Sequence, residues 1–183
     1  MKRLLLALFL LLVFTATSMA QGSAGPSSAG SINFNSPKPQ FLSFNLGVPF
    51  GYDFKSEKMA AGYNFGMSLV IADDFHVGYD FMNLENNDEK NKRPTEDSRR
   101  VFNSLRMAYY LTPVVGAAFG VGALENMVKS TTGVSMGVFA DLAQQRSALG
   151  VAYGLRLRMD YIAATNKLGK GALMFTIGTN FGL

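Results

Sequence analysis

Few side chains in this sequence could support catalysis or hold a metal ion. The 183 residues include no cysteine and one histidine, His76. The missing cysteine excludes disulfides, thiolate metal sites and cysteine nucleophiles, and a single histidine leaves most histidine-based metal sites out of reach. No serine can be assigned as a partner of His76, so we predict that the chain is not an enzyme and has no catalytic residue, metal site or cofactor.

Five charged residues stand in segments that otherwise hold apolar and small residues, namely Asp80, Arg106, Asp141, Arg156 and Arg158. Carboxylate and guanidinium groups in such surroundings can neutralise one another, gate a passage or attract anionic solutes. An unpaired charge in a narrow interior is costly, so neutralisation is the favoured interpretation. The elements that carry these residues decide which partners they can reach.

From Phe41 onward, apolar residues alternate with small or polar ones, which is the period of a β-strand. Eight segments show the alternation, and Asn103 and Thr179 are the polar exceptions in the apolar series. The eight apolar series begin at Leu42, Ala61, Phe75, Val101, Val115, Val134, Leu149 and Leu173. A helix is excluded because these residues recur at every second position.

The face opposite the apolar series holds most of the 19 glycines, together with polar residues. An eight-stranded barrel only just holds ordinary side chains, so the apolar series, with its many Phe and Tyr residues, would overfill the interior. If the apolar series meets lipid, small and polar groups fill the lumen instead. The sequence therefore predicts an all-β fold, an eight-stranded antiparallel up-and-down transmembrane β-barrel.

The connections between the segments alternate in length. Those at 72–74, 112–114 and 143–148 are short, whereas those at 51–60, 82–100, 124–133 and 160–172 are longer. Short turns on one side and long loops on the other are typical of an outer-membrane barrel whose two termini are periplasmic. We therefore expect the bacterial outer membrane as the location and the lipid bilayer as the main surrounding.

The C-terminal residues carry a resemblance to a known group. Gly178, Phe181 and Leu183 match the spacing of the C-terminal assembly signal of bacterial outer-membrane barrels, although Leu183 replaces the usual aromatic residue. With eight strands, the chain resembles the small OmpA, OmpX and OmpW barrels over residues 41–183. The resemblance implies that the barrel assembly machinery is a partner, engaged through these three residues.

The N-terminal residues differ from the rest. Lys2 and Arg3 precede an unbroken apolar run from Leu4 to Phe14, and small residues follow, so residues 1–20 are predicted to be a secretory signal peptide. Residues 21–39, rich in Gly, Ser and Pro, are predicted to be a flexible periplasmic leader, and residues 40–183 the barrel. Cleavage lowers the net charge from +4 to +2, which gives no support for nucleic-acid binding.

Strand positions then suggest pairs for the charged residues. Asp80 and Arg106 fall at similar depth on neighbouring strands, so we predict an ion pair between them. Arg156 and Arg158 are placed nearer the outer mouth, where they could attract anions, although pairing with the loop acids Asp53 or Glu125 is favoured. Asp141 and His76 are expected to face inward near the periplasmic rim.

Two functions remain open from the sequence for a monomeric barrel. One is an OmpW-like conduit or binding site for small apolar solutes, because glycines and inward residues such as Phe102, Phe139 and Met174 could leave a partly apolar cavity. The other is a closed barrel that anchors the chain and displays loops for adhesion, and it is favoured by the narrowness of eight strands. The longest loop, residues 84–100, is balanced in charge and is the candidate site for a host ligand.

Overall fold

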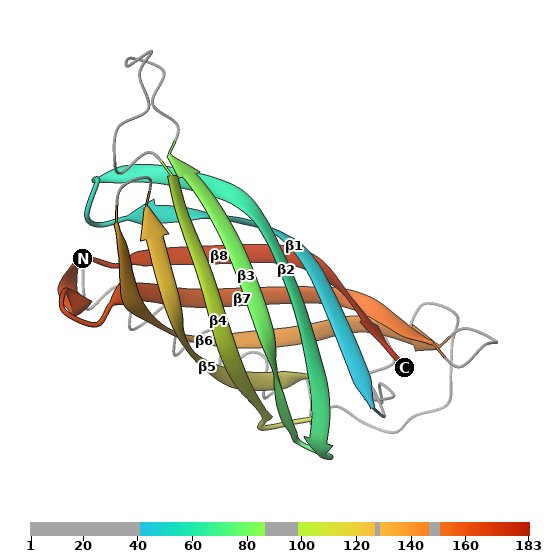
Figure 1. Ribbon diagram of the computed structural model, residues 1–183. Coiled ribbons are helices and arrows are strands. Elements are labelled where there is room, and N and C mark those ends of the chain that lie inside the picture. Colours follow the sequence, from blue (N-terminus) through green and yellow to red (C-terminus); the bar gives the residue numbers. More distant parts are fainter. Residues whose placement is uncertain (1–40, 87–98, 127–128, 147–150) are drawn as a thin grey trace.

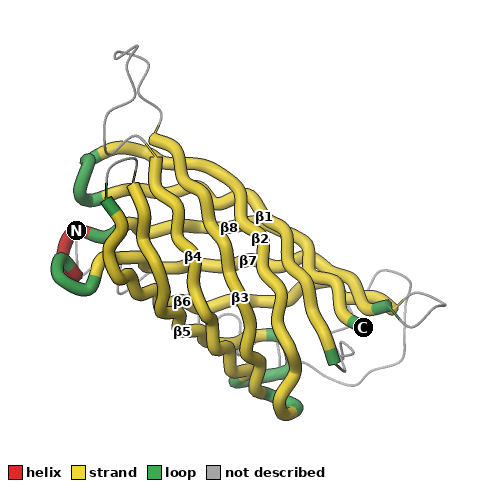
Figure 2. Tube along the Cα trace, viewed as in Figure 1, coloured by secondary structure: helices red, strands yellow, loops and turns green. Residues whose placement is uncertain are grey.

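The structure is a computed structural model, and it describes residues 41–86, 99–126, 129–146 and 151–183. Eight strands account for most of these residues (Figures 1 and 2). They are β1 (Leu42–Asp53), β2 (Lys58–Ala72), β3 (Phe75–Asn86), β4 (Arg99–Tyr110), β5 (Val115–Asn126), β6 (Ser130–Arg146), β7 (Ala152–Ala164) and β8 (Ala172–Gly182), with a short 3₁₀ turn η1 (Leu168–Lys170) before β8. No helix in the described ranges is long and apolar enough to cross a membrane.

Each strand pairs antiparallel with the next, and β1 pairs with β8, so the sheet closes on itself. The predicted fold class, an eight-stranded antiparallel up-and-down barrel, is confirmed. The expected signal peptide and leader lie outside the described residues. Phe41 and Leu183 are joined by a backbone hydrogen bond of 2.9 Å, so the described chain begins and ends at the same end of the barrel. We call this the short-turn end, and the opposite end the loop end.

The strands are tilted strongly against the barrel axis (Figure 1). The tilt follows from the strand register. Stepping from each residue to its partner on the next strand, the path starts on β1 at Ser43 and returns to β1 at Asp53, after Ser68, Gly78, Arg106, Gly120, Ser135, Ile162 and Ala172. A stagger of ten residues over eight strands corresponds to a tilt of about 40° at the usual strand rise and spacing. Such a barrel has a lumen that side chains can fill completely.

Several connections at the loop end are shorter than predicted. The first is reduced to residues 54–57, where Glu57 adopts a positive φ of 58°. Strand β7 continues to Ala164, and β3 and β4 extend into the predicted 82–100 loop, to Asn86 and from Arg99. Backbone hydrogen bonds continue the ladder after the apolar alternation stops, because they do not depend on side-chain type. The apolar series therefore underestimated the length of the strands.

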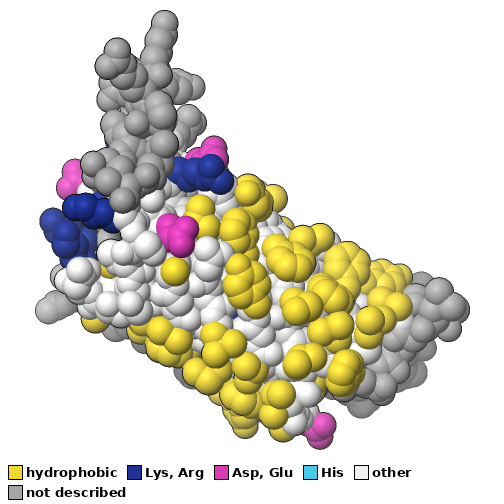
Figure 3. Space-filling model, in the orientation of Figure 1, with side chains coloured by type: hydrophobic (Ala, Val, Ile, Leu, Met, Phe, Trp, Pro, Cys, Tyr) yellow, Lys and Arg dark blue, Asp and Glu magenta, His cyan; other side chains and the backbone are white. Residues whose placement is uncertain are grey.

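The apolar series faces outward, as predicted. Along β2, for example, Tyr63, Phe65, Met67, Leu69 and Ile71 are all exposed. Figure 3 shows apolar side chains spread over the barrel wall, while charged side chains gather mainly at the loop end. The inward face of the strands forms the core, which has three layers along the barrel.

An apolar layer lies at the loop end of the lumen and consists of Ala60, Met82, Leu84, Phe102, Ile162, Ala172 and Met174. A small layer of Tyr110, Ala118 and Phe139 lies towards the short-turn end. Charged residues on β3, β4 and β7 lie between these two layers. Asp80, Arg106 and Arg158 each lie on the same strand as a member of the apolar layer, but nearer the short-turn end.

Candidate functional site: a charged layer across the lumen

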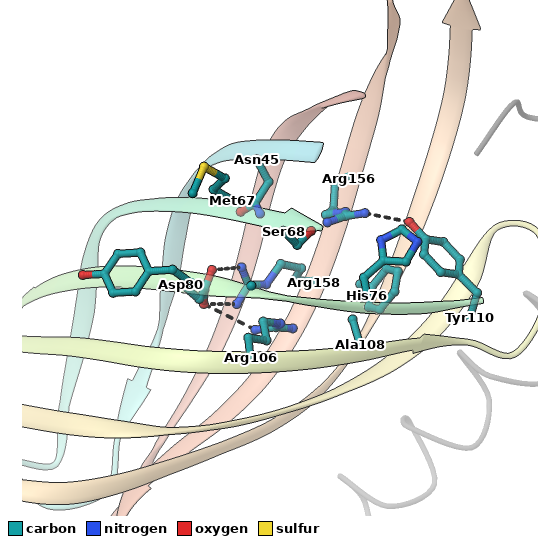
Figure 4. Close-up of a pocket in the computed structure, with 13 residues that line it drawn as sticks. Asn45, Met67, Ser68, His76, Asp80, Arg106, Ala108, Tyr110, Arg156 and Arg158 are labelled. Carbon is teal, nitrogen blue, oxygen red and sulfur yellow. Dashed lines mark hydrogen bonds and ion pairs between the residues drawn. The ribbon is translucent and has the colours of Figure 1, made fainter. Parts of the chain in front are cut away.

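The charged layer centres on Asp80, which β3 directs into the lumen. Its carboxylate accepts hydrogen bonds from Arg158 Nη1 at 3.0 Å and Nη2 at 2.9 Å, and from Asn64 Nδ2 at 3.0 Å. Arg106 Nη1 lies 3.4 Å from Asp80 Oδ2. Figure 4 shows the two guanidinium groups converging on this carboxylate. The expected contact between Asp80 and Arg106 is thus present, although Arg158 makes the shorter and bidentate pair.

Arg158 reaches Asp80 from the other side of the barrel. Its strand, β7, is four strands from β3 in the closed order of eight, so the ion pair crosses the lumen. The same guanidinium donates from Nε to Asp160 Oδ2 at 2.9 Å, and Arg106 Nη2 lies 3.1 Å from Asp160 Oδ1. Two arginines and two aspartates on three strands therefore form one crossed network that fills the middle of the lumen.

A second charged pair lies closer to the short-turn end. Arg156 and Asp141 are direct partners in the β6–β7 ladder, and Arg156 Nε and Nη2 donate to the carboxylate at 2.6 and 2.7 Å. The Tyr110 hydroxyl donates to Asp141 Oδ2 at 2.6 Å and accepts from Arg156 Nη2 at 2.9 Å. The Arg156 guanidinium carbon also lies 4.8 Å from the centre of the Phe139 ring.

Charge is balanced across these two groups. Asp80, Asp141 and Asp160 face Arg106, Arg156 and Arg158, and each carboxylate has an arginine within 3.1 Å. A buried charge without a partner would cost several kcal/mol. The pairing therefore makes the filled lumen electrically neutral along its length.

The predicted depth of Arg156 and Arg158 was wrong. Neither lies at the outer mouth, and neither pairs with Asp53, which instead binds Arg100 at 2.9 Å at the loop end. The prediction ended the strand at Met159, whereas β7 continues to Ala164. Arg158 therefore lies in the middle of its strand, where it faces interior acids.

Sequence reasoning missed three members of the network. Asp160 was assigned to a connection, although continuing the alternation past Met159 would have turned its side chain inward with Arg156 and Arg158. Asn64 and Tyr110 were not singled out, because the side-chain pattern shows that they face inward but not that they bind the interior acids Asp80 and Asp141.

His76 lies in the lumen near the short-turn end, as predicted, and is 2% exposed. Its ring packs against Tyr110 at a centroid distance of 5.0 Å. No group of three His, Asp or Glu side chains in the described ranges is arranged to hold a metal ion. The His76 side chain is therefore part of the packed wall of the lumen.

The expected apolar cavity is not found in the described lumen. Phe102, Phe139 and Met174 are 1%, 4% and 0% exposed, because they pack against neighbouring side chains of the two apolar layers. One cavity of about 30 Å³ in the described part of the lumen is bordered by Asn45, His76 and Arg106. That volume suits a water molecule and is too small for an apolar solute.

The C-terminal signal residues lie on the seam between β1 and β8. Gly178 stands opposite Gly47, and a Cβ on Gly178 would come within 2.2 Å of the Leu46 carbonyl oxygen. Phe181 and Leu183 point outward and are 39% and 56% exposed. The glycine thus has a packing reason in the closed barrel, and the assembly role of the three residues stays a prediction.

These features define a closed β-barrel with an apolar coat and a neutral, filled interior. In comparisons with solved structures, the chain is similar to de novo designed transmembrane β-barrels at 15% identity and a TM-score of 0.44, covering 80% of this chain and 98% of the design. It is also similar to Ail, the attachment invasion locus protein of Yersinia pestis, at 12% identity and a TM-score of 0.43, covering 76% of this chain and 96% of Ail.

A further similar structure is the N-terminal β-barrel domain of Pseudomonas aeruginosa OprF, at 15% identity and a TM-score of 0.41, with 76% of this chain and 96% of that domain covered. No protein-family model and no curated protein sequence matches the chain. These likenesses concern architecture, and none of those described here distinguishes an OmpW-like barrel from its small relatives.

Proposed function

We propose that the protein is a closed bacterial outer-membrane barrel that anchors the chain and displays its loops for adhesion or host interaction. The observation that carries this proposal is the filling of the described lumen by packed side chains. An apolar layer, the Arg158–Asp80 crossing and the Tyr110–Phe139 layer follow one another along the barrel. A barrel without a passage acts through its outer surface and its loops.

The outer surface supports a membrane location. From Ala61 to Ile71, the exposed series of β2 spans ten residue steps, or about 25 Å along the barrel axis at a tilt near 40°. This height matches the apolar band of membrane barrels. Aromatic rings also cluster towards the loop end of the band, with Tyr52 and Phe54 at a centroid distance of 5.3 Å and Tyr63 and Phe81 at 5.7 Å. Such rings favour the interface between lipid and water.

At the loop end, the two strands that flank the longest connection are bound to the β1–β2 hairpin. Asp53 is 1% exposed, and its carboxylate binds Arg100 at 2.9 Å and accepts from Asn86 Nδ2 at 3.5 Å. Asn86 ends β3 and Arg100 lies at the start of β4, so both stems of the 84–100 connection are tied to the β1–β2 hairpin. Residues 87–98, the centre of the candidate host-binding loop, lie outside the described residues.

We place both termini in the periplasm and the loop end outside the cell, with the barrel assembly machinery as the partner that inserts the chain. The support is the alternation of short and long connections and the spacing of Gly178, Phe181 and Leu183. Protease treatment of intact cells tests the orientation, because cleavage should then fall in connections at the loop end and not at the short-turn end. Phe181→Ala should reduce insertion more than the matched outward change Phe175→Ala.

The competing function, an OmpW-like conduit or site for a small hydrophobic solute, gains no support from the described lumen. Planar-bilayer recordings of the refolded protein separate the two functions. We expect no channel events, with a known porin as the positive control and a heat-dependent shift in gel mobility as proof of folding. Reproducible conductance, or uptake of an apolar probe into liposomes carrying the protein, would overturn the closed-barrel proposal.

Display is tested separately from closure. Cells that carry the protein should bind extracellular-matrix-coated surfaces, and replacing residues 87–98 by a Gly-Ser connection of equal length should abolish binding while the gel-mobility shift is retained. Unchanged binding by the replaced variant would exclude this connection as the site.

A further inference from the structure

The connection between β7 and β8 has a feature that the barrel itself does not require. After β7 the chain turns through η1, where Tyr161 donates its hydroxyl hydrogen to the Leu168 carbonyl oxygen. The Tyr161 oxygen also accepts from the Gly171 backbone N–H at 3.1 Å. Tyr161 belongs to the outward series of β7, so these bonds hold η1 against the outer wall of the barrel and not over the lumen.

The turn exposes an apolar side chain between two cations. Leu168 is 55% exposed, and Lys167 and Lys170 beside it are also exposed. No acidic group in the described ranges forms an ion pair with either lysine side chain. Below the turn, the Tyr161 ring lies 6.5 Å from that of Phe54, within the aromatic cluster at the loop end.

Among the residues that the structure describes, the charged side chains at the two ends of the outer surface differ in net sign. Lys167 and Lys170 belong to a loop end that also carries Lys55, Lys58, Arg99 and Lys129 against Glu57, Glu85 and Glu125. At the short-turn end, the charged side chains that the structure describes on the outer surface are Asp73 and Asp74. Figure 3 shows the Lys and Arg side chains of this view at the loop end.

We propose that η1 is a lipid-binding turn, in which Leu168 enters the membrane interface and Lys167 and Lys170 bind the phosphates of anionic lipid headgroups. An amphipathic element at the membrane interface gains binding free energy both from the burial of its apolar side chain and from attraction to anionic lipid. Gly171 permits the arrangement, because a Cβ there would come within 2.6 Å of the Tyr161 ring. The inference rests on the membrane location in the proposed function, but not on display or closure.

The sequence contains no tryptophan, so one introduced indole reports on its own surroundings. The full chain with Leu168→Trp is refolded in vesicles of phosphatidylcholine and phosphatidylglycerol, with bromine on the acyl chains of one lipid at a time. We expect brominated phosphatidylglycerol to quench the indole more strongly than brominated phosphatidylcholine. Ile71→Trp, at the short-turn end of the apolar band, should show quenching without such a preference.

Charge variants on the Leu168→Trp background identify the cause of the preference. Replacing both lysines by Gln should remove it, with about a fivefold loss in relative lipid affinity for each lysine. Replacing both by Arg should keep it, and high salt should weaken it. Equal quenching by the two lipids would overturn the phosphate contact, and no quenching of Leu168→Trp would overturn the membrane position of the turn. Failure of the membrane location itself is distinguishable, because Ile71→Trp would then also remain unquenched.

Discussion

Arg158 is the residue whose loss should damage the barrel most. It donates four hydrogen bonds, two to Asp80, one to Asn64 and one to Asp160. Its Nη2 atom also forms an ion pair with Asp160 at 2.9 Å. Arg158→Met keeps much of the side-chain volume but removes the charge. Asp80 and Asp160 would then share Arg106 alone, and the lumen would carry an excess negative charge.

The expected loss of stability is about 3–5 kcal/mol, because breaking a buried pair leaves an uncompensated charge. The full value applies because the Arg158 side chain is 3% exposed, and those of Asp80 and Asp160 are 3% and 1% exposed. Water therefore has little access to the carboxylates that lose their partner. The measurement is equilibrium unfolding in guanidinium chloride of protein refolded in lipid vesicles.

The matched control restores neutrality. Asp80→Asn on the Arg158→Met background removes the surplus charge while retaining a side chain that can bind Asn64. The double variant should be more stable than the sum of the two single losses predicts, by about 1–3 kcal/mol. The same cycle on Arg106 and Asp80, whose closest contact is 3.4 Å, should give a smaller coupling. A loss below about 1 kcal/mol for Arg158→Met, or additive losses in the cycle, would refute the crossed network as a source of stability.

Three further predictions use the same unfolding assay. Met67→Arg places a charge on the outward face at mid-height and should lower the free energy of unfolding by about 2–4 kcal/mol. The control Met67→Leu should be nearly neutral. Tolerance of the arginine would contradict the lipid-facing orientation. Gly178→Ala should cost about 1–3 kcal/mol through its clash with the neighbouring backbone, while Gly169→Ala, which has no atom within 4 Å of its Cβ, should be tolerated. Tyr110→Phe leaves the buried Asp141 with one donor fewer and should cost about 1–3 kcal/mol, and no measurable loss would show that Arg156 alone satisfies the carboxylate.

The architecture could be predicted from the sequence because every strand of a closed membrane barrel alternates outward apolar residues with inward small or polar ones. Residues from Tyr63 to Ile71 on β2 and from Leu105 to Tyr109 on β4 follow that rule, and the apolar residues at every second position, counted from Tyr63 and from Leu105, are exposed. Strand ends were less accessible, since a ladder continues through polar residues such as Asp53 and Lys58, which pair with each other. The contact between Asp80 and Arg106 was accessible because it joins adjacent strands.

Contacts across the lumen were not accessible in the same way. Arg158 and Asp80 are 78 positions apart in the chain, and their meeting depends on the stagger and on the width of the closed barrel. The sequence shows that both face inward, but it does not show which acid lies across from which arginine. Placing Arg158 too close to the loop end therefore led to the wrong expected partner, Asp53 in place of Asp80.

The glycines explain why an inward face of small residues encloses so little space. A Cβ on Gly137 would come within 2.4 Å of Asp160 Oδ1, and a Cβ on Gly66 within 2.3 Å of the Asn45 amide nitrogen. The volume that these glycines leave is therefore occupied by polar side chains of neighbouring strands. In a lumen only just wide enough for side chains, the arginines fit because neighbouring inward positions are glycines, which have no side chain. Glycine on the inward face here accompanies a filled interior, and this is the reason that the small residues do not indicate a passage for solutes.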